Sequence, residues 1–526
     1  MSPIVDTLTL TAEDAIALVE RDEISAAELH AAYLEAIGEH DEELHCYLRT
    51  VDEANGAGIP IALKDVISTR GVETTAGSRI LSGYVPVFDA TVAARCKVAG
   101  LTLLGKTNTD EFAMGSSTEN SAYGPSRNPW NPDLVPGGSG GGTAAAVSAG
   151  LAPWGLGSDT GGSIKQPSAL CGNVGLRPTY GTVSRYGVVA FASSLDQVGP
   201  VAKTVRDVAL LYRIIAGRDA ADSTTVELPE PVELPSNERL DGLRIGVPRQ
   251  AVALEAIEPG VRAAFEATLA LAEGLGAEVG ECDLPLSFDY GLPCYYLIAP
   301  AEASSNLARY DGVRYGVRGE GDTYRDMVER TRDAGFGDEP KRRIMLGTYA
   351  LSAGYYDAYY GQAQRVRTLI VREHASAFES YDVLATPTSP TVAFPIGDRA
   401  ADPLAMYACD LLTIPSCLAG LPGLNVPCGF SDELPVGLQL IGPQFSENRL
   451  FRAGHALERA LGLDLVPASE AGSVQRSFTY IAIGSSIRSP MPNATNGDVG
   501  ETSTSACSNA AVKSRTISVR TFCACP

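Results

Sequence analysis

The chain has 526 residues, of which 45% are hydrophobic and 20% charged, and this balance predicts a globular protein with a large core. Its net charge is −22 and no Lys/Arg-rich run occurs before residue 477, so we expect no basic surface for direct binding of nucleic acid. The basic residues are 34 Arg and only 7 Lys. No apolar stretch reaches the roughly 18 residues that span a bilayer, and six acids in the first 25 residues argue against a signal peptide. We therefore expect a soluble, cytoplasmic protein without a membrane partner, and the acidic, Lys-poor surface favours adaptation to high salt over an ordinary acidic enzyme.

The first half of the chain predicts a helical opening followed by an α/β core. Residues 11–50 have helical periodicity, with capping patterns at Thr11 with Asp14 and at Ser25 with Glu28. Short apolar runs then alternate with Ala-rich helical stretches, which predicts an α/β layer architecture. The runs are 59–63, 101–104 and 188–192, and the helical stretches are 90–99 and 143–150.

The second half predicts an insert that is mainly helical. Residues 219–240 form an exposed connection, and 245–286 read as strand, helix and strand, with Pro259 at a helix start. A long helical region follows to about residue 380, after which short strands and turns return. The final stretch, 477–526, is Ser/Thr-rich, with two acids and four bases, and we interpret it as a disordered, atypical tail; a regulatory tail is the alternative.

The cysteines indicate neither a disulfide framework nor a metal site. All 11 are scattered, without a CxxC pair or a Cys/His group at metal-ligand spacing. We expect reduced thiols and no structural zinc.

A literal Walker A pattern occurs at residues 100–107, but its context argues against phosphate binding. A phosphate loop follows a strand and precedes a helix. Here a helix-like run precedes Gly100, and the residues up to Lys106 are strand-like. We interpret Gly100 as the end of a helix and expect no ATP at this segment.

The segment 137–141 matches the G-x-S-x-G nucleophile elbow. This elbow needs a strand before it and an Asp/His pair later in the chain. The preceding 128–136 is rich in Asn and Pro, and the five histidines lie in helix-like surroundings. A Ser-His-Asp hydrolase is therefore a weak alternative.

A third motif combines Lys64 with two serines, Ser139 and Ser163, that each lie in a glycine-rich segment. Glycine lets the backbone approach a substrate, so the amides of 160–163 can converge on one oxygen as an oxyanion hole. Lys64 follows the apolar run 59–63, and a lysine that is neutral through burial can act as a base. The alternative is an exposed strand-end lysine beside flexible loops.

Together these segments resemble the amidase signature family, over nearly all of residues 8–470. The resemblance implies a large mixed β-sheet sandwiched between helical layers, with an amidase domain over 1–476 whose catalytic core is 59–470. It also implies a Ser-Ser-Lys triad of Ser163 as nucleophile, Ser139 as bridge and Lys64 as base, and an oxyanion hole at Thr160, Gly161 and Gly162.

Longer segments narrow the resemblance to the glutaminase subunits (the A subunits) of tRNA-dependent amidotransferases. They are residues 105–130, 176–200, 301–316, 341–360 and 434–442. This likeness implies glutamine as substrate, held by Arg343, Asp410 and Tyr295. It also implies the B and C subunits as partners in a heterotrimer, mischarged Glu-tRNA or Asp-tRNA bound through a partner, and ATP and Mg²⁺ at that partner, with no cofactor or metal in this chain.

The sequence departs from the family pattern at four positions near these residues. Gly140, Thr143 and Lys165 replace the usual Ser, Ser and Arg, and Val66 replaces a common Asn. Lys165 loses the planar fork of Arg, and Val66 removes a polar group near the base. Two alternatives thus stay open, a stand-alone amidase for small amides and a catalytically silent scaffold in a tRNA-modifying complex.

Overall fold

The computed structural model describes residues 5–467, so the predicted tail lies outside the described residues. The chain opens with two helices, α1 (Ala12–Glu20) and α2 (Ala26–Leu44). The Thr11 hydroxyl accepts the Asp14 N–H at 3.1 Å, and Ser25 and Glu28 form a reciprocal capping box at 3.2 and 3.0 Å. Both helix starts are confirmed, since each hydroxyl satisfies an amide that the helix leaves unpaired.

One mixed sheet of 11 strands forms the centre of the fold, in the order β1-β3-β2-β4-β6-β5-β10-β11-β9-β7-β8. Parallel pairing joins β3, β2 and β4 and also β8, β7 and β9, whereas the other neighbours are antiparallel. This confirms the predicted α/β class. The strands are β1 (Tyr47–Thr50), β2 (Pro60–Lys64), β3 (Thr102–Thr107), β4 (Trp154–Asp159), β5 (Val174–Arg177), β6 (Gln197–Ala202), β7 (Arg244–Pro248), β8 (Glu278–Cys282), β9 (Val383–Pro387), β10 (Gly423–Ser431) and β11 (Leu434–Ile441).

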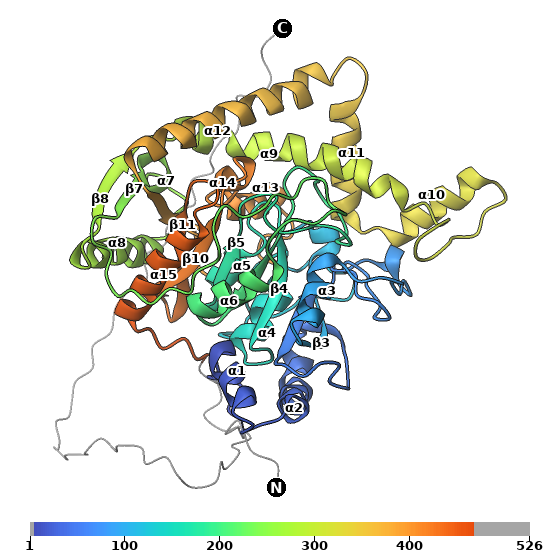
Figure 1. Ribbon diagram of the computed structural model, residues 1–526. Coiled ribbons are helices and arrows are strands. Elements are labelled where there is room, and N and C mark those ends of the chain that lie inside the picture. Colours follow the sequence, from blue (N-terminus) through green and yellow to red (C-terminus); the bar gives the residue numbers. More distant parts are fainter. Residues whose placement is uncertain (1–4, 468–526) are drawn as a thin grey trace, which may run out of the picture. The chain divides into compact units, whose positions relative to one another are not determined.

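Helices surround this sheet, and the insert between β8 and β9 lies along one side of the fold (Figure 1). Within the insert, α9 packs against both α11 and α12. The shorter helices α4 and α5 pack on the central strands and carry the two serine loops at their N-terminal ends. The remaining helices are α3 (Thr91–Val98), α4 (Gly141–Ser148), α5 (Lys165–Cys171), α6 (Val205–Ile215), α7 (Arg249–Val252), α8 (Pro259–Gly274), α9 (Pro285–Asn306), α10 (Tyr324–Gly335), α11 (Asp338–Leu351), α12 (Gln362–Ser380), α13 (Pro403–Tyr407), α14 (Ile414–Leu418) and α15 (Glu447–Leu461).

One expectation about local structure is wrong and another is incomplete. The apolar run 188–192 is not a strand: Val188 forms one isolated bridge with Ile67, and the amides of Phe191 and Ala192 donate to the Asp196 carboxylate. A side chain thus takes the hydrogen bonds that a neighbouring strand would have accepted. The expectation of short strands and turns for the last part of the core is incomplete, because this part ends in the 15-residue helix α15, which holds His455 in the helix-like surroundings expected for it.

The Walker-like segment is a helix end followed by a buried strand. Gly100, at φ +84°, follows α3, and β3 begins at Thr102. The fully buried Lys106 lies 3.2 Å from the Asp65 carboxylate and donates to the Ile67 carbonyl at 2.7 Å. These residues therefore form no loop that could surround a phosphate.

The structure of residues 5–467 also describes the cysteines, the apolar helices and the possible metal ligands of this range. The eight cysteines in this range are free thiols, and no helix in it is long and apolar enough to cross a membrane. The same range contains no group of His, Cys, Asp or Glu side chains that could hold a metal ion.

The capping box of α2 generates a prediction about stability. Ser25→Ala leaves the first turn of the helix without its side-chain acceptor, so we expect the free energy of unfolding to fall by about 1 kcal/mol. Urea unfolding monitored by circular dichroism measures this loss. Glu42→Ala, on the exposed side of the same helix, is the control and should change stability by less than about 0.5 kcal/mol. Equal stability of the two variants would contradict the assigned cap.

Candidate active site

A buried lysine at the end of β2 lies beside the first serine loop. All five residues of β2 are buried, and Lys64, the last of them, has no exposed surface. Its Nζ lies 2.7 Å from Ser139 Oγ and 3.3 Å from the Ser158 carbonyl oxygen. The strand therefore positions the amine in contact with a hydroxyl group, and the alternative of an exposed strand-end lysine is wrong.

Burial changes the protonation of this lysine. Removal from water disfavours the ammonium form and lowers the pKa of Lys64 from 10.5 to about 7, although the carboxylates of Asp110, Asp159 and Asp196 oppose this shift. The Lys64 amine can therefore lose its proton near neutral pH. An uncharged amine can accept the proton of the Ser139 hydroxyl.

The two serine loops contact each other through their backbones. The Gly140 N–H donates to the Ser163 carbonyl at 3.1 Å. A Cβ atom on residue 140 would lie only 2.5 Å from that carbonyl oxygen, closer than real Cβ atoms approach. Gly140, one of the departures from the family pattern, thus allows this close approach between the loops of Ser139 and Ser163.

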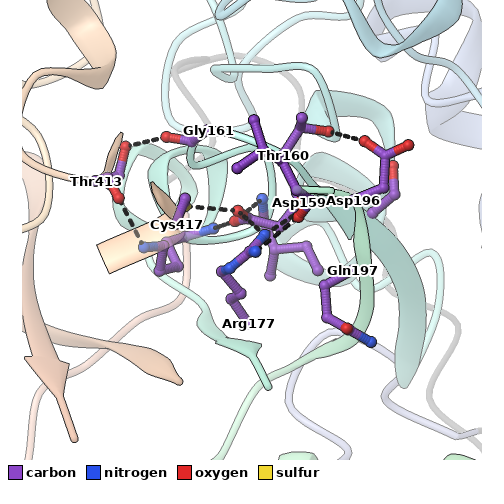
Figure 2. A network of polar contacts seen from close by, with 12 residues as sticks. Asp159, Thr160, Gly161, Arg177, Asp196, Gln197, Thr413 and Cys417 are labelled. Carbon is purple, nitrogen blue, oxygen red and sulfur yellow. Dashed lines mark hydrogen bonds and ion pairs between the residues drawn. The ribbon is translucent and has the colours of Figure 1, made fainter. Parts of the chain in front are cut away.

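The backbone from Thr160 to Ser163 is held in an open turn before α5 (Figure 2). The Thr160 hydroxyl donates to Asp196 at 2.7 Å, and the Thr413 hydroxyl donates to the Gly161 carbonyl at 2.6 Å. Gly162 has φ +145°, a conformation that favours glycine. Within residues 5–467 no acceptor is found for the amides of 161–163, so these N–H groups are free to bind an anionic oxygen.

Asp159 fixes the other side of this turn (Figure 2). Its carboxylate accepts the Ile164 N–H at 3.0 Å, the Arg177 guanidinium at 3.1 Å and the Cys417 thiol at 3.3 Å. Burial raises the pKa of Asp159, but the charges of Lys165 and Arg177 outweigh it and hold the pKa below its usual value. The turn is therefore anchored to an ionised, fully buried carboxylate.

The structure also places the other three departures from the family pattern. The ammonium group of Lys165 has three acceptors, the Gln439 side chain at 2.7 Å, the Ser416 hydroxyl at 2.9 Å and the Thr413 carbonyl at 3.3 Å. Thr143 shares a hydrogen bond of 2.6 Å with Thr107. Val66 is buried, and its carbonyl accepts the Val189 N–H at 2.8 Å.

The three residues expected to bind substrate come from different elements and lie near the turn. Arg343 is on α11, Asp410 is at the end of a short 3₁₀ turn (Ala408–Asp410), and Tyr295 is on α9. The Tyr295 ring faces Gly161, since a Cβ at that glycine would lie 2.9 Å from the tyrosine hydroxyl. All three side chains are at least nine-tenths buried.

The carboxylate of Asp410 is only half satisfied. One oxygen accepts the Ser116 hydroxyl at 2.6 Å, while the other is buried without a hydrogen-bond partner in the described chain. Burial raises the pKa of Asp410 to about 7, against the opposing effects of Ser116 and of the positive charge on Arg343. A buried acceptor without a donor is costly, and an ammonium group would relieve that cost.

Several residues that shape the site were not identified from the sequence. Five polar residues make these contacts: Asp110, Asp159, Asp196, Ser116 and Thr413. The Asp110 carboxylate accepts the amides of Thr118 and Asn120, and the other four bind the turn before Ser163 or the Asp410 carboxylate through the hydrogen bonds described above. Each of the three acids lies within or beside a stretch rich in Gly, Ser or Thr. An Asp in such a stretch can indicate a carboxylate that stabilises a loop, because its two oxygens can accept hydrogen bonds from several backbone amides.

Comparison with known proteins defines the family. The family model described as Amidase matches residues 22–451. The chain belongs to the amidase signature family. It is 57% identical to the A subunit of glutamyl-tRNA(Gln) amidotransferase from Roseiflexus sp. (strain RS-1), over 86% of this chain and 96% of that protein. The A subunit from Streptomyces avermitilis is 53% identical, over 87% of this chain and 96% of that protein.

Solved structures agree with the fold. The A subunit of glutamyl-tRNA(Gln) amidotransferase from Thermotoga maritima superposes with a TM-score of 0.75 at 46% identity, covering 87% of this chain and 96% of that one. A 6-aminohexanoate cyclic dimer hydrolase, whose structure was solved with its substrate, also gives 0.75, at 27% identity over 87% and 98% of the two chains. The mixed sheet with its surrounding helices is thus the amidase signature fold. The chain is an amidase-type enzyme.

The protonation of Lys64 generates a prediction about pH dependence. If neutral Lys64 is the base, kcat/KM for amide hydrolysis rises with pH and levels off above an apparent pKa of about 7. Asp110→Asn removes the carboxylate that most favours the ammonium form, so the rising limb should move to lower pH. Asp338→Asn, an exposed acid, is the control and should leave the profile unchanged. A profile that falls across pH 6 to 8 would contradict a lysine base.

Proposed function

We propose that this chain is the glutaminase subunit of a tRNA-dependent amidotransferase, hydrolysing glutamine to glutamate and supplying ammonia to a partner protein. One observation carries the proposal: a buried Lys64 amine lies 2.7 Å from Ser139, next to a turn with free amides that ends in Ser163. High identity to proteins named as the A subunit of glutamyl-tRNA(Gln) amidotransferase supports it.

Acylation begins at Ser163. Its Oγ attacks the side-chain carbonyl carbon of glutamine, and its proton passes to Ser139 as the Ser139 proton passes to neutral Lys64. The backbone amides of Thr160, Gly161 and Gly162, together with that of Ser163, would stabilise the negative oxygen. When the tetrahedral intermediate collapses, the Lys64 ammonium returns a proton through Ser139 to the leaving nitrogen, and ammonia departs from a glutamyl ester on Ser163.

Deacylation reverses these proton transfers. Water attacks the ester carbonyl and gives a proton through Ser139 to Lys64. The second intermediate collapses with return of that proton to Ser163 Oγ, which releases glutamate and regenerates the enzyme. In both acylation and deacylation the Lys64 amine acts first as a base and then, once protonated, as an acid. A group that must do both works best when its pKa lies near the working pH.

Glutamine is a zwitterion, and the predicted binding residues complement both of its charges. The Arg343 guanidinium would bind the α-carboxylate, because a planar fork of donors matches two oxygens. The unpartnered oxygen of Asp410 would accept from the α-ammonium group. Tyr295, which lies against Gly161, would contact the substrate between these groups and the oxyanion turn.

The partners follow from the proposed reaction. Ammonia would pass to the B subunit, which would bind ATP, Mg²⁺ and the mischarged tRNA, while the C subunit would complete a heterotrimer. An acidic chain is consistent with tRNA contact through a partner. The cytoplasmic location and the high-salt adaptation stay predictions, and the acceptor is Glu-tRNA, Asp-tRNA or both.

Neither alternative function has an observation in its favour. A silent scaffold was suggested by Gly140, Lys165 and Val66, but Gly140 permits the contact between the two serine loops and Lys165 has three acceptors. A stand-alone amidase for small amides does not need paired sites for a carboxylate and an ammonium group.

Removal of the predicted nucleophile tests the proposal. In the complex with its partners, Ser163→Ala should reduce glutamine-dependent amidation of tRNA by at least about 1000-fold, because no acyl-enzyme can form. Amidation driven by free ammonium should continue at the normal rate. Ser168→Ala, which removes a buried hydroxyl without a hydrogen-bond partner in the described chain, is the matched control. Undiminished use of glutamine by Ser163→Ala would refute the proposal.

A further inference from the structure

The guanidinium of Arg343 is enclosed by aromatic rings. Its carbon atom lies 5.2 Å from the centre of the Tyr296 ring, 5.4 Å from that of Tyr407 and 5.5 Å from that of Phe191. Tyr296 and Tyr407 also stack on each other with their centroids 4.0 Å apart. Cation–π contacts to these rings stabilise the charge of an arginine that has almost no exposed surface.

Glu339, one turn before Arg343 on α11, binds the Nε side of the Arg343 guanidinium. Its Oε1 accepts Arg343 Nε at 2.7 Å and the Tyr407 hydroxyl at 2.8 Å, and its Oε2 pairs with Arg342. Glu339 is itself only 6% exposed. Burial raises its pKa, but Arg343, Tyr407 and Arg342 outweigh this effect and keep the carboxylate ionised.

These contacts leave one edge of the guanidinium available. Nε is occupied by Glu339, and the two terminal nitrogens of Arg343 have no acceptor among the described residues. The three aromatic rings and the Glu339 contact together restrict the orientation of the planar guanidinium. A fixed pair of parallel N–H donors is the arrangement that binds a carboxylate in a bidentate manner.

We propose that Glu339 is a positioning residue that orients Arg343 and so makes the site selective for amides that carry an α-carboxylate. This inference rests on the proposed function, in which Arg343 binds the carboxylate of glutamine. Glu339 does not touch the substrate. It acts by keeping the terminal nitrogens of Arg343 directed into the site.

A simpler explanation for Glu339 is its place in the first turn of α11, where any acid favours the helix dipole. Asp338 provides the comparison, since it lies in the same turn and is exposed. A dipole effect would be shared by both acids. The contacts with Arg343 and Tyr407 belong to Glu339 alone of these two.

The test compares glutamine with 4-aminobutanamide, which is glutamine without its α-carboxylate, on the full chain assembled with its partners. In Glu339→Gln, we expect KM for glutamine to rise at least about 10-fold with kcat changed less than about threefold. The affinity for 4-aminobutanamide, measured as a substrate or as a competitive inhibitor, should not change. Asp338→Asn should match the unmodified protein in both measurements.

Other outcomes would overturn the inference in distinguishable ways. Equal weakening of glutamine and 4-aminobutanamide would show that Glu339 supports the fold of the site generally, and an unchanged KM would show that it does not position Arg343. Arg343→Lys separates these results from failure of the proposed function. If Arg343→Lys raises KM for glutamine while Glu339→Gln does not, only the positioning role fails; if neither does, Arg343 is not the carboxylate anchor.

Discussion

The site depends on the removal of one lysine amine from water. Lys64 ends a strand whose residues are all buried, and the parallel pairing of β2 with β4 brings the Ser158 carbonyl to 3.3 Å from the amine. Full burial of a charged ammonium group is costly, and this cost lowers the pKa of Lys64 from 10.5 to about 7. Its contact with Ser139 then places an amine that can lose its proton near pH 7 beside a hydroxyl group.

Buried acids balance that lysine and also hold the backbone around it. Asp110 and Asp196, whose pKa values burial raises to about 6, accept amides from loop residues, and Asp159 anchors the turn before Ser163. Too many negative charges would restore the ammonium form of Lys64, whereas too few would leave loop amides without acceptors. Phe191 connects this region to Arg343, the proposed carboxylate-binding residue, since its amide donates to Asp196 and its ring faces the Arg343 guanidinium.

Much of the fold was predictable because local signals agreed with the tertiary structure. The hydroxyl caps at Thr11 and Ser25, the glycine after α3 and Pro259 at the start of α8 each act within a few residues of themselves. The run 188–192 was misjudged because the amides of Phe191 and Ala192 donate to the Asp196 side chain, a contact that hydropathy does not reveal. The glycine-rich serine loops and the apolar run before Lys64 pointed to Lys64, Ser139 and Ser163, and the family resemblance gave them their expected roles. It did not reveal that Glu339 joins Arg343 to Tyr407, because that contact depends on α11 and α13 meeting in space.

The central claim is that Ser163 becomes acylated by glutamine with Lys64 as the base, and mass spectrometry of the acid-quenched complex tests it most directly. Turnover with glutamine should leave a glutamyl ester on the peptide that contains Ser163 and none on the peptide that contains Ser139. Lys64→Met should abolish the ester. An ester on Ser139, or glutamate release at the normal rate by Lys64→Met, would contradict the account.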